Sequence, residues 1–242
     1  MKIIQSILTN NPCYKAGKKI TVKGLMLHSV GCPQPSAAVF VKSWNRADYE
    51  RACVHAFIDG NDGTVYQTLP WNHRGWHCGG KCNNTHIGIE MCEPATTDKD
   101  KARAVVQRTY DNAVVLFAHL CVKFDLDPMT DIISHKEGGA KGIASKHSDP
   151  EHLWQSLGMG YTMDTFRKAV NLACGGSYLV RVTTDNLNVR KGAGVKFGVS
   201  AVVNKGEVFT IVEEKMNGST KWGKLKSGAG WISLKYTEKV KG

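Results

Sequence analysis

The sequence predicts an α/β domain followed by a small all-β barrel, and three observations indicate this division. Up to Cys174, short apolar and β-branched runs alternate with helical patterns. Residues 175–177, Gly-Gly-Ser, form a small, flexible stretch typical of a linker. From Tyr178 onward, only short strand-like runs between turns follow. We therefore predict domains over 1–174 and 178–242, joined at 175–177, in a chain of 242 residues that is long enough for both.

The strands expected in the first domain are short runs rich in apolar and β-branched residues. They span Ile20–His28, Cys53–Asp59, Thr64–Leu69, Ile87–Cys92 and Ile132–His135. Between the second and third runs lies a turn cluster, Asp59-Gly60-Asn61-Asp62-Gly63. Because Asn, Asp and Gly adopt the backbone conformations that tight turns need, we expect Cys53–Leu69 to form a hairpin.

Two helices are expected in the first domain. Ala102–Phe124 has apolar residues at intervals of three to four, which is the period of an amphipathic helix. Thr97 and Asp100 have the spacing of a capping-box variant at its start. Asp164–Leu172 is expected to form a second helix that closes the domain.

The second domain is expected to contain six strands in its 65 residues, a density typical of a small barrel. They span Tyr178–Val182, Leu187–Val189, Val199–Val203, Val208–Glu213, Trp222–Lys226 and Gly230–Ile232. This domain has 12 Lys and Arg against 5 Asp and Glu, a net charge of +7, compared with +4 for residues 1–177. A small basic unit indicates an anionic polymer partner, and charge alone fits nucleic acid as well as a cell-wall polyanion.

Eight cysteines are too few for a disulfide scaffold in a chain of this length, and they lack a paired CxxC pattern. We interpret them mainly as buried thiols in a reducing cytoplasm, with a structural bridge as the alternative. Cys78 and Cys82 form a single CxxxC, which leaves their pairing open.

The N-terminal residues Met1–Asn10 are too short and too interrupted for the apolar core of a signal peptide. No window of the sequence reaches the roughly 18 apolar residues that a membrane span requires. We therefore expect synthesis in the cytoplasm, without a signal peptide and without membrane insertion.

All nine histidines lie between His28 and His152, and three stand in contexts typical of a site. His28 and His135 each end an apolar, strand-like run, as does Glu90, while His147 opens the tetrad His147-Ser148-Asp149-Pro150. Strand ends and the loops after them are where α/β folds place functional groups. A catalytic zinc site needs three protein ligands, an open position and a base. His28, His135 and one of His147 or Asp149 are the candidate ligands, and Glu90 is the candidate base.

Five separate motifs, in order along residues 20–155, carry a family resemblance. They are Leu27-His28-Ser29, Val54–Gln67, Trp76-His77-Cys78-Gly79, Asn84–Glu90, and His135 with His147-Ser148-Asp149-Pro150. Together they resemble the zinc-dependent N-acetylmuramoyl-L-alanine amidases of the type 2 class, a family shared with bacteriophage endolysins and animal peptidoglycan recognition proteins. The resemblance implies a mixed central sheet flanked by helices, with a cleft that holds Zn²⁺.

The resemblance also implies a role for each site residue. His28, His135 and Asp149 match the zinc ligands, and Glu90 matches the carboxylate that handles the catalytic water. Two residues before the third ligand, most relatives carry a lysine that stabilises the tetrahedral intermediate, whereas this chain has His147. Two assignments stay open: His147 as an oxyanion donor or proton shuttle beside the ligand Asp149, or His147 as the ligand with Asp149 as its supporting partner.

Trp76 and His77 match a family motif on the cleft wall, which implies substrate contact or a role in shaping the cleft. A cysteine–histidine nucleophile built on Cys78 or Cys32 is a weaker alternative, because the sequence around neither cysteine singles it out.

The second domain carries its own resemblance. Leu187-Asn188-Val189-Arg190 and Gly230-Trp231-Ile232 resemble the bacterial SH3-like domain of cell-wall hydrolases. This implies a wall-anchoring module without catalytic activity, in agreement with a basic barrel that contains neither His nor Cys. Arg190 and Trp231 are candidate contacts to the wall, and both fit a purely structural role in the barrel equally well.

Both resemblances together imply a peptidoglycan hydrolase that cleaves the amide between N-acetylmuramic acid and the L-alanine of the stem peptide. The expected partners are bacterial peptidoglycan and other cell-wall polymers, not nucleic acid. A phage or prophage endolysin, released by a holin, is the expected origin, and a host autolysin is the second. The alternatives are a peptidoglycan-binding protein without activity and a hydrolase of another wall peptide bond.

Overall fold

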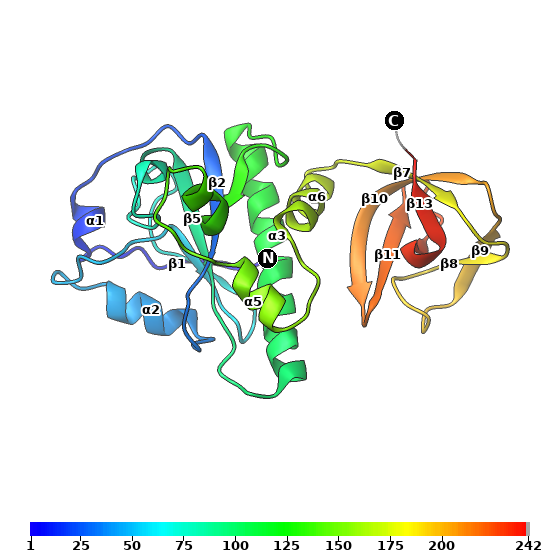
Figure 1. Ribbon diagram of the computed structural model, residues 1–242, viewed down its shortest axis with the longest axis horizontal. Helices are drawn as coiled ribbons and strands as arrows, with labels where there is room; N and C mark the ends of the chain where they lie inside the picture. Colours follow the sequence, from blue (N-terminus) through cyan, green and yellow to red (C-terminus); the bar gives the residue numbers. More distant parts are fainter. Residues whose placement is uncertain (241–242) are drawn as a thin grey trace. The chain divides into compact units, whose positions relative to one another are not determined.

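The computed structural model describes residues 1–240, and the chain divides into two compact units between Arg167 and Lys168 (Figure 1). This division lies inside helix α6 (Met163–Ala173), and the predicted linker at 175–177 comes directly after that helix. The domain limits at 174 and 178 stay predictions.

The first unit is built on a six-stranded mixed sheet in the order β1-β4-β3-β5-β2-β6. The strands are β1 (Ile3–Gln5), β2 (Gly24–Ser29), β3 (Ala56–Ile58), β4 (Val65–Gln67), β5 (His86–Met91) and β6 (Ile132–Ser134). Neighbours are parallel except for the antiparallel pair β3–β4, which confirms the predicted hairpin. The edge strand β1 was not predicted; its three residues pair with Val65–Gln67, a segment far along the chain.

Helices cover both sides of this sheet. They are α1 (Pro12–Lys15), α2 (Ala37–Trp44), α3 (Lys99–Phe124), α4 (His135–Ala140), α5 (Glu151–Ser156) and α6, with a 3₁₀ turn at Lys81–Asn84. The long helix α3 runs along one side, and α1 and α2 lie on the other (Figure 1). Phe40 of α2 stacks on Phe57 of β3 with ring centroids 4.9 Å apart, which anchors α2 to the sheet. The predicted α/β class of this unit is confirmed.

The long helix α3 begins three residues before the predicted Ala102, and the predicted capping box is wrong. Its N-cap is Asp98, whose carboxylate accepts hydrogen bonds from the amides of Asp100 and Lys101. An aspartate caps at least as well as a threonine, and its negative charge also favours the positive end of the helix dipole. Asp98 therefore takes the capping role that the sequence pattern assigned to Thr97.

Strand register brings His28 of β2 and Glu90 of β5 to one face of the sheet. His28 pairs with Glu90, so both side chains project on the same face, while the fully buried Leu27 and Ile89 project on the other. Leu27 also pairs with Ser134, which places His135 next to His28. The sequence prediction that His135 ends a strand is wrong by one residue. Ser134 caps α4 through a capping box with Glu137, so the helix begins at His135 itself.

The second unit contains a seven-stranded antiparallel sheet that curls into a barrel (Figure 1). The strands are β7 (Tyr178–Val182), β8 (Leu187–Arg190), β9 (Val199–Val203), β10 (Val208–Asn217), β11 (Thr220–Leu225), β12 (Trp231–Ser233) and β13 (Thr237–Lys239). All six predicted strands are present, and β13 adds a seventh beside β7. Its core is aliphatic: Val180, Val182, Leu187, Val189, Val203, Ile211, Leu225 and Ile232. The predicted small barrel is confirmed.

Two sequence questions are answered by the fold. Cys78 and Cys82 form a disulfide, whereas Cys13, Cys53 and Cys92 are buried thiols. Among residues 1–240, no helix combines the length and the apolar character needed to cross a bilayer.

Candidate metal centre

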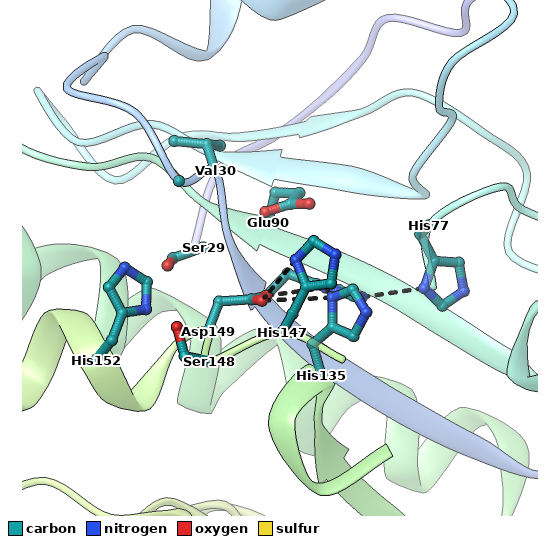
Figure 2. A pocket seen from close by; sticks show the side chains of 11 residues that line it. Ser29, Val30, His77, Glu90, His135, His147, Ser148, Asp149 and His152 are labelled. Atoms are coloured by element: carbon teal, nitrogen blue, oxygen red, sulfur yellow. Dashed lines mark hydrogen bonds and ion pairs between the residues drawn. The ribbon is translucent and has the colours of Figure 1, made fainter. Parts of the chain in front are cut away.

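The polar face of the first sheet opens into a pocket of about 450 Å³ (Figure 2). Five of the residues that line it are histidines, and the lining comprises His28, Ser29, Val30, Gly31, His77, Glu90, His135, His147, Ser148, Asp149 and His152. In Figure 2, His77 lies at one end of this group, and His152 and Ser29 lie at the other. The strands β2 and β5, helix α4 and the loop before α5 all contribute to it.

Three buried side chains converge in this pocket: His28, His135 and Asp149. Nδ1 of His28 lies 3.1 Å from Nδ1 of His135 and 3.2 Å from Oδ2 of Asp149, and Nδ1 of His135 lies 3.4 Å from Oδ1 of Asp149. Zinc bonds of 2.0–2.2 Å in a tetrahedral site correspond to ligand–ligand separations of about 3.3–3.6 Å. The separations of 3.1, 3.2 and 3.4 Å lie within about 0.2 Å of that range, so the donor set and its spacing fit a zinc ion after a small adjustment.

Backbone contacts bring the third member of the group into place. Asp149 lies 121 residues from His28 along the chain, yet their side chains touch. The amide of Lys136, in the first turn of α4, donates a hydrogen bond to the carbonyl oxygen of Asp149 at 3.3 Å. This bond ties the loop that carries Asp149 to the helix that begins at His135.

The charge of Asp149 is stabilised inside the protein. Burial alone would raise the pKa of this carboxyl group, but hydrogen bonds from His135 and His28 outweigh it and hold the pKa well below its usual range. Asp149 is therefore an anion, as a metal ligand must be.

His147 lies next to the three converging residues but outside their group. Its side chain is 56% exposed, and its ring stacks on that of His135 with centroids 4.2 Å apart. Its Nδ1 lies 3.7 Å from Oδ1 of Asp149. Of the two assignments that the sequence left open, the structure brings Asp149 together with His28 and His135 and leaves His147 at the pocket rim.

Glu90 faces the same pocket from β5 (Figure 2). Burial, with smaller contributions from the charges of Asp149 and Glu93, raises the pKa of its carboxyl group well above the usual range. Its Oε2 atom is buried and has no hydrogen-bond partner within residues 1–240. A buried carboxylate oxygen without a partner, beside a metal-type donor set, is suited to bind and deprotonate a water molecule.

The two residues predicted on the cleft wall occupy different environments. His77 lines the pocket, and both of its ring nitrogens contact protein atoms: Nδ1 lies 3.0 Å from Nε2 of His28, and Nε2 lies 3.1 Å from the carbonyl oxygen of His86. Trp76 is absent from the pocket lining and packs instead against the buried cluster of Leu8, Cys13, Cys53 and Leu69.

Sequence reasoning missed several residues of the site. Nε2 of His135 lies 3.1 Å from the hydroxyl of Ser145, which donates to the carbonyl oxygen of Cys78 at 3.1 Å. Ser29 and His152 line the pocket beside Asp149. His152 could have been suspected from its place two residues after Pro150, but nothing in the sequence around Ser145 predicts its contact with His135.

In the second unit, the two predicted wall contacts are engaged within the barrel. Nη1 of Arg190 donates to the carbonyl oxygens of Val195 and Phe197 at 3.1 and 2.9 Å, which holds the loop between β8 and β9. Trp231 is half-buried, and Nζ of Lys224 lies 5.8 Å from the centre of its ring. The contacts of Arg190 are those of a structural residue.

Comparisons with known proteins find a matching family model in each of the two units. The family model for N-acetylmuramoyl-L-alanine amidase matches residues 18–152, and the model for the bacterial SH3 domain matches residues 185–238. The chain is 32% identical over 145 residues to N-acetylmuramoyl-L-alanine amidase CwlH of Bacillus subtilis (strain 168), and 28% identical over 144 residues to the amidase XlyA of the same strain. Each match takes in 58% of this chain, but only 52% of CwlH and 41% of XlyA. The chain thus spans about half the length of the curated relatives it matches.

Solved structures show the same fold. The crystal structure of Staphylococcus aureus hydrolase AmiA in complex with its ligand superposes with a TM-score of 0.59 at 20% identity, covering 72% of this chain and 83% of that one. The catalytic domain of XlyA superposes with a TM-score of 0.51 at 26% identity, covering 72% of this chain and all of that one.

The family match and the metal centre coincide. Residues 18–152 make up more than half of the chain, and they include His28, Glu90, His135 and Asp149. The chain belongs to the N-acetylmuramoyl-L-alanine amidase family.

Proposed function

We propose that this protein is a zinc-dependent N-acetylmuramoyl-L-alanine amidase that hydrolyses the amide between N-acetylmuramic acid and the L-alanine of the peptidoglycan stem peptide. The observation that carries the proposal is the convergence of His28, His135 and Asp149 beside a carboxylate oxygen of Glu90 that has no partner within residues 1–240. Family membership supplies the substrate class.

His28, His135 and Asp149 would hold the zinc ion, leaving room for one further ligand from the open pocket. When bound, zinc lowers the pKa of water to about 7 and polarises a carbonyl group as a Lewis acid. Glu90 orients a water molecule in the pocket and takes its proton at Oε2. The same carboxyl group then protonates the leaving amine of the L-alanine, so that the amide is cleaved by one molecule of water.

His147 is proposed as the group that stabilises negative charge on the carbonyl oxygen as it develops. The ring lies at the pocket rim, stacked on His135, with its exposed edge free to donate an N–H to substrate. A preorganised donor of this kind is typically worth about 10²–10³ in rate.

The second unit is proposed to hold the enzyme on the bacterial wall. It matches the bacterial SH3 domain model, and its net charge of +7 favours anionic wall polymers. With Arg190 engaged in the barrel, Trp231 and the surface lysines are the proposed contacts. As an endolysin, the protein would reach the wall through a membrane lesion made by a holin.

Mass spectrometry of a peptidoglycan digest tests the proposed reaction. An amidase leaves free lactyl carboxylates on muramic acid and new N-terminal alanines on the stem peptides. New termini at a peptide crosslink would show a hydrolase of another bond. An unchanged digest, from protein shown to contain zinc, would show a peptidoglycan-binding protein without activity.

A further inference from the structure

His77 connects a proposed zinc ligand to the protein backbone. Nδ1 of His77 lies 3.0 Å from Nε2 of His28, and Nε2 of His77 lies 3.1 Å from the carbonyl oxygen of His86 on β5. The rings of His28 and His77 meet edge to face, with an interplanar angle of 84°. A continuous chain of contacts therefore runs from the backbone of β5 through His77 to the side of the His28 ring that faces away from Asp149.

The directions of both hydrogen bonds in this series of contacts follow from the carbonyl oxygen of His86, at which the series ends. A carbonyl oxygen can only accept a hydrogen bond. Nε2 of His77 therefore carries the ring proton and donates a hydrogen bond to the carbonyl oxygen of His86. Nδ1 of the neutral His77 ring is then an acceptor, and Nε2 of His28 must donate to it. This leaves Nδ1 of His28 without a proton, and Nδ1 is the atom that faces His135 and Asp149.

The sheet is shaped to receive the His77 ring. A Cβ atom at Gly88 would lie 2.4 Å from Cγ and 2.5 Å from Nδ1 of His77, and one at Gly75 would lie 2.8 Å from Cδ2. Neither residue has a positive φ, so neither needs to be glycine for its backbone conformation. Their missing side chains leave the space that the ring fills.

The backbone on both sides of His77 is also held. The amides of His77 and Cys78 both donate to Oδ1 of Asn83, at 2.9 and 3.1 Å, and the disulfide between Cys78 and Cys82 closes the same loop. The side chain of His77 is buried, and its ring packs edge to face against that of His28. Such a rigid partner can orient a metal ligand.

We propose that His77 is a positioning residue of the metal centre: it accepts the Nε2 proton of His28 and so keeps Nδ1 of His28 unprotonated and aimed at the zinc position. The motif implied substrate contact or a role in shaping the cleft, and the proposal assigns His77 instead to the orientation of a metal ligand. The proposal rests on the proposed zinc site, and it extends that site to a residue that touches neither metal nor substrate.

Zinc affinity, measured by competition with a chromophoric chelator, tests this role without reference to activity. His77→Leu removes the acceptor and should weaken zinc binding by about 10–100-fold, the usual cost of losing such a partner. His77→Asn puts an amide oxygen where Nδ1 was and should restore most of the affinity. His55→Leu is the matched control, because His55 is buried beside His77 but bonds only to the backbone of Gly88 and His73. It should bind zinc as the unaltered protein does.

The outcomes separate this inference from the proposed function. If the unaltered chain binds no zinc, the proposed function fails and this inference fails with it. If it binds zinc and His77→Leu binds equally well, or if His77→Asn is as weak as His77→Leu, only the positioning role is overturned.

A measurement on the unaltered chain covers the case in which His77→Leu does not fold. Long-range ¹H–¹⁵N spectra of the zinc-loaded protein with labelled histidines report which ring nitrogen carries the proton. His28 and His77 should both be protonated at Nε2 only. A proton on Nδ1 of His77 would overturn the proposal.

Discussion

The two units of this chain differ in how many polar side chains they bury. The first unit buries His28, His55, His77, His135 and Asp149, each at most 8% exposed, and gives every one of them a polar partner. In the described part of the second unit, Ser233 is the one buried polar side chain, the core is aliphatic, and the excess positive charge lies at the surface.

This contrast reflects two physical tasks. Chemistry on an amide needs groups held in fixed positions out of bulk water, and burial of a polar group costs free energy unless the group is hydrogen-bonded. Attraction to a charged polymer needs charge at the protein surface and does not depend on exact positions of buried side chains. Changes at the pocket residues of the first unit should therefore alter rate or metal content, whereas charge changes in the second unit should alter affinity for the wall.

The largest effect is expected from Asp149→Ala. Removal of one of three ligands should release zinc and reduce amide hydrolysis to background, because no centre remains to activate water. Metal content and hydrolysis of soluble muropeptide measure the two effects. Asp185→Ala, at an exposed aspartate of the second unit, is the control and should change neither. Zinc retained at a full equivalent by Asp149→Ala would contradict the ligand assignment.

Glu90→Gln should keep zinc but lower kcat by about 10²–10⁴-fold, the usual contribution of a general base. The amide fills the same space but cannot take a proton from water. Steady-state kinetics on soluble muropeptide, together with metal content, test this. Glu50→Gln, at an exposed glutamate, should behave like the unaltered enzyme. An unchanged kcat in Glu90→Gln would remove Glu90 from the reaction.

His147→Ala should retain zinc and lower kcat by about 10²–10³-fold, the scale of one oxyanion donor. His147→Lys should recover part of the rate, because an ammonium group can donate to the oxyanion without ligating the metal. Steady-state kinetics and metal content of both variants test these expectations. If His147→Ala releases zinc while Asp149→Ala retains it, the two roles are reversed.

The smallest effect is expected from charge removal in the second unit. Replacing the exposed Lys205, Lys215 and Lys226 with Gln should weaken wall binding about tenfold at low salt, at roughly 0.5 kcal/mol per charge. The difference should vanish at high salt, where surface charges are screened. Hydrolysis of soluble muropeptide should stay unchanged. Equal wall binding at low salt would show that charge does not carry the anchoring.

Local patterns predicted much of this architecture from the sequence. The six strands of the barrel and the β3–β4 hairpin are visible as apolar runs between turn residues. The strand ends also indicated His28, Glu90 and His135 correctly as neighbours, because parallel strands in register bring their ends to one edge. The short edge strand β1 and the capping residue Asp98 were not predicted. β1 forms by pairing with β4, a distant segment, and the cap depends on two side-chain hydrogen bonds, so neither produces a repeating pattern in the sequence.

By itself, the sequence determined the residue types available for chemistry, the division into an α/β part and a barrel, and the family resemblance. Only the tertiary structure decided which groups meet. His147 and Asp149 are two residues apart in a loop with no periodicity, and the backbone bond from Lys136 to Asp149 brings Asp149 to the two histidines. The contact between His77 and His28 spans 49 residues and depends on space left by Gly88 on another strand. Local propensity acts over a few residues, whereas a metal centre is assembled from distant segments by packing.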